Sequence, residues 1–156
     1  MKTLCVILIS CGICLFCDEA NADDWVYYAK DNLGNYKFYD RSSISFPSKN
    51  IIRVWKKDVY SKDGIKDYVA QRARNKLSIY GYEELSHVEC KEELNCTTKE
   101  HRLLACSMYD KSGSVVESQS ATTEHQAWEP VLPDSDLDAF HAVLCKSPPK
   151  NTKKKK

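Results

Sequence analysis

Eight cysteines and four histidines are the residues of this chain that could form disulfides, hold a metal ion or act as nucleophiles. Half of the cysteines lie in the first 17 residues, and the others lie in the body, at Cys90, Cys96, Cys106 and Cys145. Zinc ligands usually come as two closely spaced pairs, a spacing that the body cysteines lack. Cys11, Cys14 and Cys17 have the spacing of a redox or iron–sulfur motif, but they belong to an apolar leader. What the body cysteines do therefore depends on the compartment that the chain reaches.

The first 22 residues have the pattern of a secretory signal peptide. Lys2 supplies a positive start, residues 4–17 form a nearly unbroken apolar run, and Ala20-Asn21-Ala22 is a small-residue cleavage pattern. The run is shorter than the ~20 apolar residues that span a bilayer. We predict cleavage between Ala22 and Asp23 and export to the periplasm, the cell surface or the medium.

A lipoprotein is the alternative for the same segment. Leu8-Ile9-Ser10-Cys11 is similar to a lipobox, which would leave a lipid-modified Cys11 at a new N-terminus. The apolar run continues past Cys11, which favours simple secretion. Mass spectrometry of the mature N-terminus distinguishes the two.

Export places the body cysteines in an oxidising compartment, where two disulfides are expected. Strand-like runs at 85–96 and 99–109 flank a Thr97-Thr98 turn, and centring the hairpin there sets Cys90 opposite Cys106. The same register sets His87 opposite Tyr109 and His101 opposite Asn95. Opposed Cβ atoms lie ~4.5–5.5 Å apart, close to what a disulfide needs. That pairing leaves Cys96 for Cys145. A turn shifted by one residue would move the opposed pair.

Length and composition predict one folded domain of 156 residues, because 42% of them are hydrophobic and 29% charged. These values exclude a collagen-like, disordered or multi-span membrane chain. The net charge of +1 argues against a nucleic-acid partner. Six lysines lie within 146–156, a segment without apolar residues that we predict to be a disordered tail. This tail, or a lipid on Cys11, would be the chain's only route to a membrane.

Sequence periodicity predicts an α+β fold, with strands paired in hairpins, one inserted helix and a C-terminal helix that we expect to lie on the sheet. Aromatic runs at 24–30 and 36–40 indicate a first hairpin, and residues 51–60 a third strand. Residues 62–78 change to a helical period. The hairpin with Cys90 and Cys106 follows, and residues 114–121 form the last strand.

The C-terminal helix is marked by its first residues. Ser135 and Asp138 approach a capping box, and acidic side chains favour the positive end of the helix dipole. The helix presents one face, which we expect to lie on the sheet, at Leu137, Phe140, His141 and Leu144. Cys145 ends the helix and can tether it there.

Several short motifs occur in an order that resembles the surface-adhesin protein E family of exported bacterial proteins. They are Asp24-Trp25-Val26, Tyr39-Asp40, Arg53-Val54-Trp55, Glu93-Leu94-Asn95-Cys96, Arg102-Leu103-Leu104, Tyr109-Asp110-x-x-Gly113, Trp128-x-Pro130, Pro133-Asp134-Ser135 and Cys145-Lys146. The resemblance covers residues 24–146, within a predicted domain of residues 23–145. It implies a curved antiparallel sheet of about six strands with a disulfide-tethered C-terminal helix. Cys90, Cys106 and the lysine tail depart from the family pattern.

The resemblance also implies a function. Members of this family act as adhesins that bind host extracellular-matrix proteins, and haem binding has been associated with them. From the residues alone, an exposed sheet face or the tyrosine-rich first hairpin would hold the protein or polymer partner. The hairpin tyrosines are Tyr27, Tyr28, Tyr36 and Tyr39, and ordinary strand packing is the alternative role for each.

No catalytic motif accompanies these features. The chain lacks G-x-S-x-G, H-E-x-x-H and a phosphate-binding glycine loop, and neighbours such as Glu92 and Glu93 point to opposite faces of a strand. We therefore predict a non-enzymatic protein without a metal site. A small ligand or haem carrier is the alternative, with one ligand among His87, His101, His125 and, least favoured, His141.

Overall fold

The computed structural model describes residues 23–120 and 127–146. The predicted cleavage site after Ala22, the alternative lipid site at Cys11 and residues 147–156 of the predicted tail lie outside this part. Within it, no helix is long and apolar enough to cross a membrane.

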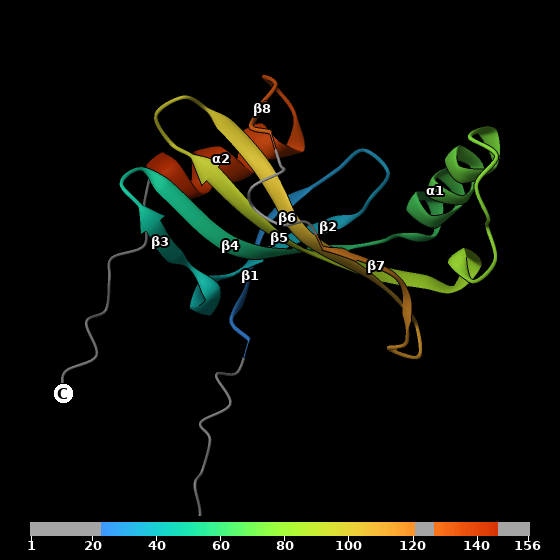
Figure 1. The fold of residues 1–156 in the computed structure, drawn as a ribbon. Coiled ribbons are helices and arrows are strands. Elements are labelled where there is room, and N and C mark those ends of the chain that lie inside the picture. The colour runs from blue at the N-terminus through green and yellow to red at the C-terminus, as the bar shows by residue number, and fades with distance from the viewer. Residues whose placement is uncertain (1–22, 121–126, 147–156) are drawn as a thin grey trace, which may run out of the picture.

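One antiparallel sheet forms the centre of the molecule (Figure 1). Its main strands follow the order β1-β2-β4-β5-β6-β7, while short β3 pairs with β4 and short β8 pairs with β6. The strand bounds are β1 Trp25–Lys30, β2 Tyr36–Asp40, β3 Ser45–Ser48, β4 Ile51–Val59, β5 Leu85–Asn95, β6 Glu100–Asp110, β7 Val115–Ser120 and β8 Glu129–Pro130. The α+β prediction is confirmed, with the two short strands added to the expected six.

Both α-helices contact the same face of the sheet, near its opposite ends (Figure 1). Helix α1 spans Lys62–Arg74 and α2 spans Asp136–Lys146, and two 3-10 turns occupy Arg41–Ser43 and Tyr82–Glu84. Because side chains alternate along a strand, one face meets the helices and the other does not. We name them the covered face and the uncovered face.

Helix α2 seals the main core. Phe140 and Leu144 are fully buried against Ile52, Val54 and Leu94 of the covered face. At the helix start, the Ser135 hydroxyl accepts a hydrogen bond of 3.1 Å from the Asp138 backbone N–H, as the capping pattern predicts. The Asp138 carboxylate accepts from Asp134 N–H rather than from Ser135.

Helix α1 closes the other end of the covered face less completely. Its Tyr68 ring lies 5.7 Å from Tyr60, beside a smaller cluster of Val88, Cys90 and Cys106. The expected extent of 62–78 is wrong at its end, because Lys76 takes a positive φ of 56°.

Cys145 is bonded to Cys96, which ties α2 to the end of β5, with Cα atoms 5.4 Å apart. Cys90 is bonded to Cys106 directly across β5 and β6, at 4.2 Å. The predicted register holds there. It is wrong nearer the turn, where an irregularity past Lys91 sets His101 opposite Leu94 instead of Asn95.

Candidate functional site

The uncovered face carries aromatic rings that lie beneath cations. Four such pairs involve residues from β1 to the segment before β8: Lys30 over Tyr36 at 4.8 Å, Lys57 over Trp25 at 4.0 Å, Lys91 over Trp55 at 5.6 Å and Arg102 over Trp128 at 4.5 Å. A cation within about 6 Å of a ring centre is attracted to the negative face of the ring. The pairs hold both kinds of side chain in place on a face that neither helix covers.

Two carboxylates of the uncovered face, Glu93 and Glu89, pair with its cations. Glu93 is buried and accepts from Arg53 and Arg102 on either side, each at 2.6 Å. Glu89 pairs with Lys57 at 2.8 Å. The lysines and arginines of these pairs outnumber the two carboxylates, which gives this part of the face a positive character that suits an acidic partner.

The tyrosines of the first hairpin divide between the two faces. Tyr27 and Tyr36 are about half exposed, lie on the uncovered face and contact each other at 6.2 Å. Tyr28 and Tyr39 instead pack against Phe140 of α2. Tyr27 and Tyr36 can therefore contact a partner, as predicted for all four tyrosines. Tyr28 and Tyr39 have the alternative role, which is packing in the core.

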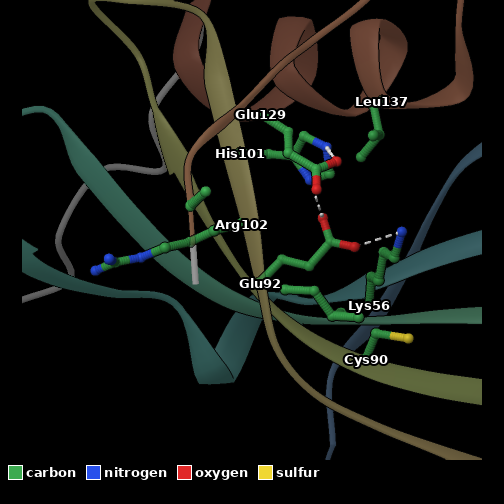
Figure 2. A pocket seen from close by; sticks show the side chains of 9 residues that line it. Lys56, Cys90, Glu92, His101, Arg102, Glu129 and Leu137 are labelled. Carbon is green, nitrogen blue, oxygen red and sulfur yellow. Dashed lines mark ion pairs between the residues drawn. The ribbon is translucent and has the colours of Figure 1, made fainter. Parts of the chain in front are cut away.

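A cavity of about 530 Å³ opens on the covered face, next to Leu137 in the first turn of α2 (Figure 2). Its polar wall is built by Lys56 of β4, Glu92 of β5, His101 of β6 and Glu129 of β8. Figure 2 shows Glu92 directed toward the other three side chains. Lys56 pairs with Glu92 at 2.6 Å, and each ring nitrogen of His101 lies 3.9 Å from a carboxylate, of Glu92 or of Glu129.

An adjoining cavity of about 310 Å³ shares Lys56 and Leu137 with the first. Lys37 lies at its centre with an exposed side-chain fraction of 8%. Its ammonium meets three carboxylates, from Asp31 at 3.6 Å, Asp58 at 3.1 Å and Asp136 at 3.0 Å. Carboxylates from the turn after β1, from β4 and from the start of α2 therefore converge on one amine.

These networks shift the pKa values of their members. Burial lowers the pKa of Lys37 and of Lys56, but the neighbouring carboxylates outweigh it, so both pKa values rise and both amines stay charged. Burial raises the pKa of Tyr28, and the negative charges of Asp58, Glu92 and Asp136 add to the rise. The covered face thus holds charged groups in a fixed arrangement beside the core.

The described histidines do not converge on a site. His87 stacks on Tyr109 with ring centres 4.8 Å apart. Burial lowers the pKa of His87, and the positive charge of Lys57 lowers it further. His141 is buried beneath α2 and lies 3.4 Å from the carbonyl oxygen of Asn95. His101 alone lines the cavity, and His125 lies outside the described residues.

A histidine-ligated haem needs an imidazole that faces a largely apolar slot, and the three described histidines do not supply one. His101 is flanked by Glu92 and Glu129, His87 stacks on a ring, and His141 faces the core. We derive no chemistry through haem from these residues. The one group of described side chains close enough together for a metal ion is Cys96, His141 and Cys145, whose sulfurs are joined in a disulfide.

Sequence reasoning missed the charged cavity. It expected Glu92 and Glu93 to point to opposite faces, and they do: Glu92 contacts Lys56 while Glu93 contacts Arg53. A signal was present, because Lys56 shares strand parity with the core residues Ile52 and Val54. A charged side chain at a core parity needs a buried partner.

Comparisons with known proteins agree with this architecture. A family model described as Surface-adhesin protein E matches residues 25–146. The selenomethionine form of Haemophilus influenzae protein E is similar in structure, with a TM-score of 0.50 and 14% identity over 79% of this chain and 86% of that one. Crystal form II of that protein gives a TM-score of 0.49 and 15% identity, over 80% and 88%. No curated protein sequence matches this chain.

Proposed function

Because the chain belongs to the surface-adhesin protein E family, we propose that it is a non-enzymatic adhesin whose uncovered sheet face binds an acidic extracellular or envelope partner. The family supports an exported or cell-surface location. The partner is a protein or surface polymer that carries carboxylate or sulfate groups.

The observation that carries the proposal is the row of cation–π pairs on the uncovered face. Aromatic and arginine side chains dominate the energetics of binding surfaces. Here the rings are already ordered by their cations, so binding orders few additional side chains. Lys57 and Lys91 lie on neighbouring strands and present two ammonium groups beside Trp25 and Trp55.

The test is binding of the folded, disulfide-bonded chain to immobilised extracellular-matrix extract, measured by surface plasmon resonance. Lys57→Met together with Lys91→Met should weaken binding about tenfold, since each lost rim charge is worth up to about 1 kcal/mol. The affinity should also fall with rising salt.

Lys62→Met with Lys66→Met is the matched control, because it removes two exposed charges from α1. It should leave the affinity within twofold of the wild type, on the order of experimental error. Equal loss in both double variants would mean that net charge, and not the uncovered face, drives binding.

The alternative function is a small-ligand or haem carrier, and the cavity on the covered face is the observation that favours a small ligand. Haem titrated into the purified chain would produce a Soret shift if a histidine ligates the iron. If a His101→Gln variant still shifts the Soret band, another residue ligates the iron. If the wild-type chain leaves the Soret band unchanged, it does not bind haem.

A further inference from the structure

The side chains in and around the two cavities include more carboxylates than amines. Two amines, Lys37 and Lys56, face five carboxylates, which are Asp31, Asp58, Glu92, Glu129 and Asp136. Buried charges are costly unless they are paired. The carboxylates outnumber the amines, and a bound cation would balance part of this negative charge.

Three polar atoms in these walls make no hydrogen bond with a described residue. They are Glu92 Oε2, Asp58 Oδ1 and His101 Nδ1. The Glu92 side chain is 4% exposed, so water reaches its carboxylate poorly. A buried acceptor without a donor costs about 1–3 kcal/mol. A ligand that donates to Glu92 Oε2 would satisfy this buried acceptor.

The geometry suits a single nitrogen. Glu92 Oε2 and His101 Nδ1 are 3.9 Å apart, so one ammonium can lie within hydrogen-bonding distance of both. His101 then accepts at Nδ1 and carries its proton at Nε2, which faces Glu129. Lys56 already uses the other oxygen of Glu92 and leaves Oε2 to the ligand.

A metal ion fits less well. Among the described residues, no three ligand atoms of this cavity lie close enough together to coordinate one. The rest of the lining includes Leu103, Leu137 and the Cys90 side chain, and also Arg102, whose guanidinium pairs with Glu93. The two leucines have no role toward a bare ion, but they can pack against a hydrocarbon body.

We propose that the cavity binds a small primary amine with an apolar body. The ammonium donates to Glu92 Oε2 and His101 Nδ1, and the body lies against Leu103 and Leu137. Glu129, with 74% of its side chain exposed, stands at the rim and attracts the cation. This site lies on the covered face, so it does not depend on the proposed adhesive surface.

The experiment is titration of the folded chain with benzylamine, followed by amide chemical shifts in NMR. Benzyl alcohol is the neutral match for shape, and benzoate is the anionic one. Benzylamine should shift the resonances of Glu92, His101 and Leu137, and should bind at least about tenfold more tightly than benzyl alcohol. Benzoate should produce no shift at these residues.

Two variants locate the site. Glu92→Gln should weaken benzylamine binding at least about tenfold, because it removes the buried charge that receives the ammonium. Glu129→Gln should weaken it by up to about fivefold, since this carboxylate is exposed. Glu83→Gln, an exposed position on the 3-10 turn Tyr82–Glu84, is the control and should leave binding unchanged.

If Glu92→Gln does not fold, the comparison of benzylamine with benzyl alcohol on the wild-type chain still decides the outcome. Equal binding of benzylamine and benzyl alcohol, shifts confined to residues away from the cavity, or no shift up to about 10 mM amine would overturn the proposal. A chain that fails this test and still binds matrix extract would leave the proposed adhesive function standing.

Discussion

The covered and uncovered faces of the same sheet differ in how they arrange apolar and charged side chains. The covered face buries Ile52, Val54 and Leu94 beneath α2 and gathers its charges in cavities beside that core. The uncovered face places lysine and arginine over tryptophan and tyrosine rings. Each strand contributes to both, because alternate side chains point to opposite sides. Stability and recognition can therefore be changed separately.

The two faces also hold their cations differently. Lys37 is buried and meets three carboxylates, so its position is fixed by charge. Lys57 is fixed partly by a ring and partly by Glu89, and it remains partly exposed. Removing the first leaves buried negative charge, whereas removing the second leaves a ring in contact with water. We expect large and small effects, respectively.

Loss of the tether between the covered face and α2 should have the largest effect. Cys96→Ala with Cys145→Ala removes a disulfide between residues 49 apart in sequence. The gain in entropy of the unfolded chain should lower the free energy of unfolding by about 4 kcal/mol. Urea unfolding measures the change. Cys90→Ala with Cys106→Ala, a separation of 16, should cost about 3 kcal/mol. A smaller loss from the first pair than from the second would contradict this order.

Core truncation tests the packing under α2. Phe140→Ala removes a fully buried ring and should lower the free energy of unfolding by about 3–4 kcal/mol. Tyr36→Ala, on the uncovered face with 45% of the residue exposed, should cost about 1 kcal/mol or less. Thermal unfolding of both variants measures the contrast, and similar losses would show that α2 is not the main cover.

Lys37→Met removes the amine shared by Asp31, Asp58 and Asp136. The variant should lose about 3 kcal/mol, because breaking a buried pair leaves uncompensated charge. The raised pKa of Lys37 means that its contribution is complete below the unfolded pKa, about 10.4, and is lost as pH rises through the folded pKa. Urea unfolding at neutral pH measures the loss, and Lys66→Met, an exposed lysine, is the neutral comparison.

On the uncovered face, Lys57→Met should change stability by only about 0.5–1 kcal/mol, the value of an exposed cation–π contact. Chemical unfolding gives this number, and Trp25 fluorescence reports the altered contact. A loss as large as that of Lys37→Met would mean that the uncovered face is also part of the stabilising core.

The smallest effect is the response of His87 to acid. Its pKa is lowered in the folded chain by burial and by Lys57, so the unfolded chain binds the proton more readily. Stability should therefore decline slightly as pH falls below about 6.5. Thermal melts should show that His87→Gln reduces this decline, and an unchanged pH profile would refute it.

The face to which each strand residue points and the position of the turn could be predicted from the sequence. The Thr97-Thr98 turn set Cys90 against Cys106 and His87 against Tyr109, as the structure has them. The same rule failed at His101, because a bulge adds one residue to β6 and no residue type announces it. Likewise, the end of α1 depended on a positive φ at Lys76, which its residue type does not require.

The charged cavities could not be predicted in the same way. Alternation places Lys37 and Asp58 on faces of their own strands, but it does not say which face a helix will cover. Tyr27 and Tyr28 are neighbours of the same residue type. Only the packing of α2 makes Tyr28 a core residue and leaves Tyr27 exposed for contact.

By itself, the sequence determined the order of strands and helices, the capped start of α2 and a pairing of cysteines that one hairpin register allows. These features depend on neighbours along the chain or directly across one turn. Only the tertiary structure decided that Lys37 would meet Asp31, Asp58 and Asp136, or that His101 would lie between Glu92 and Glu129. Such encounters join distant segments, and their energies depend on burial that exists only once the chain has folded.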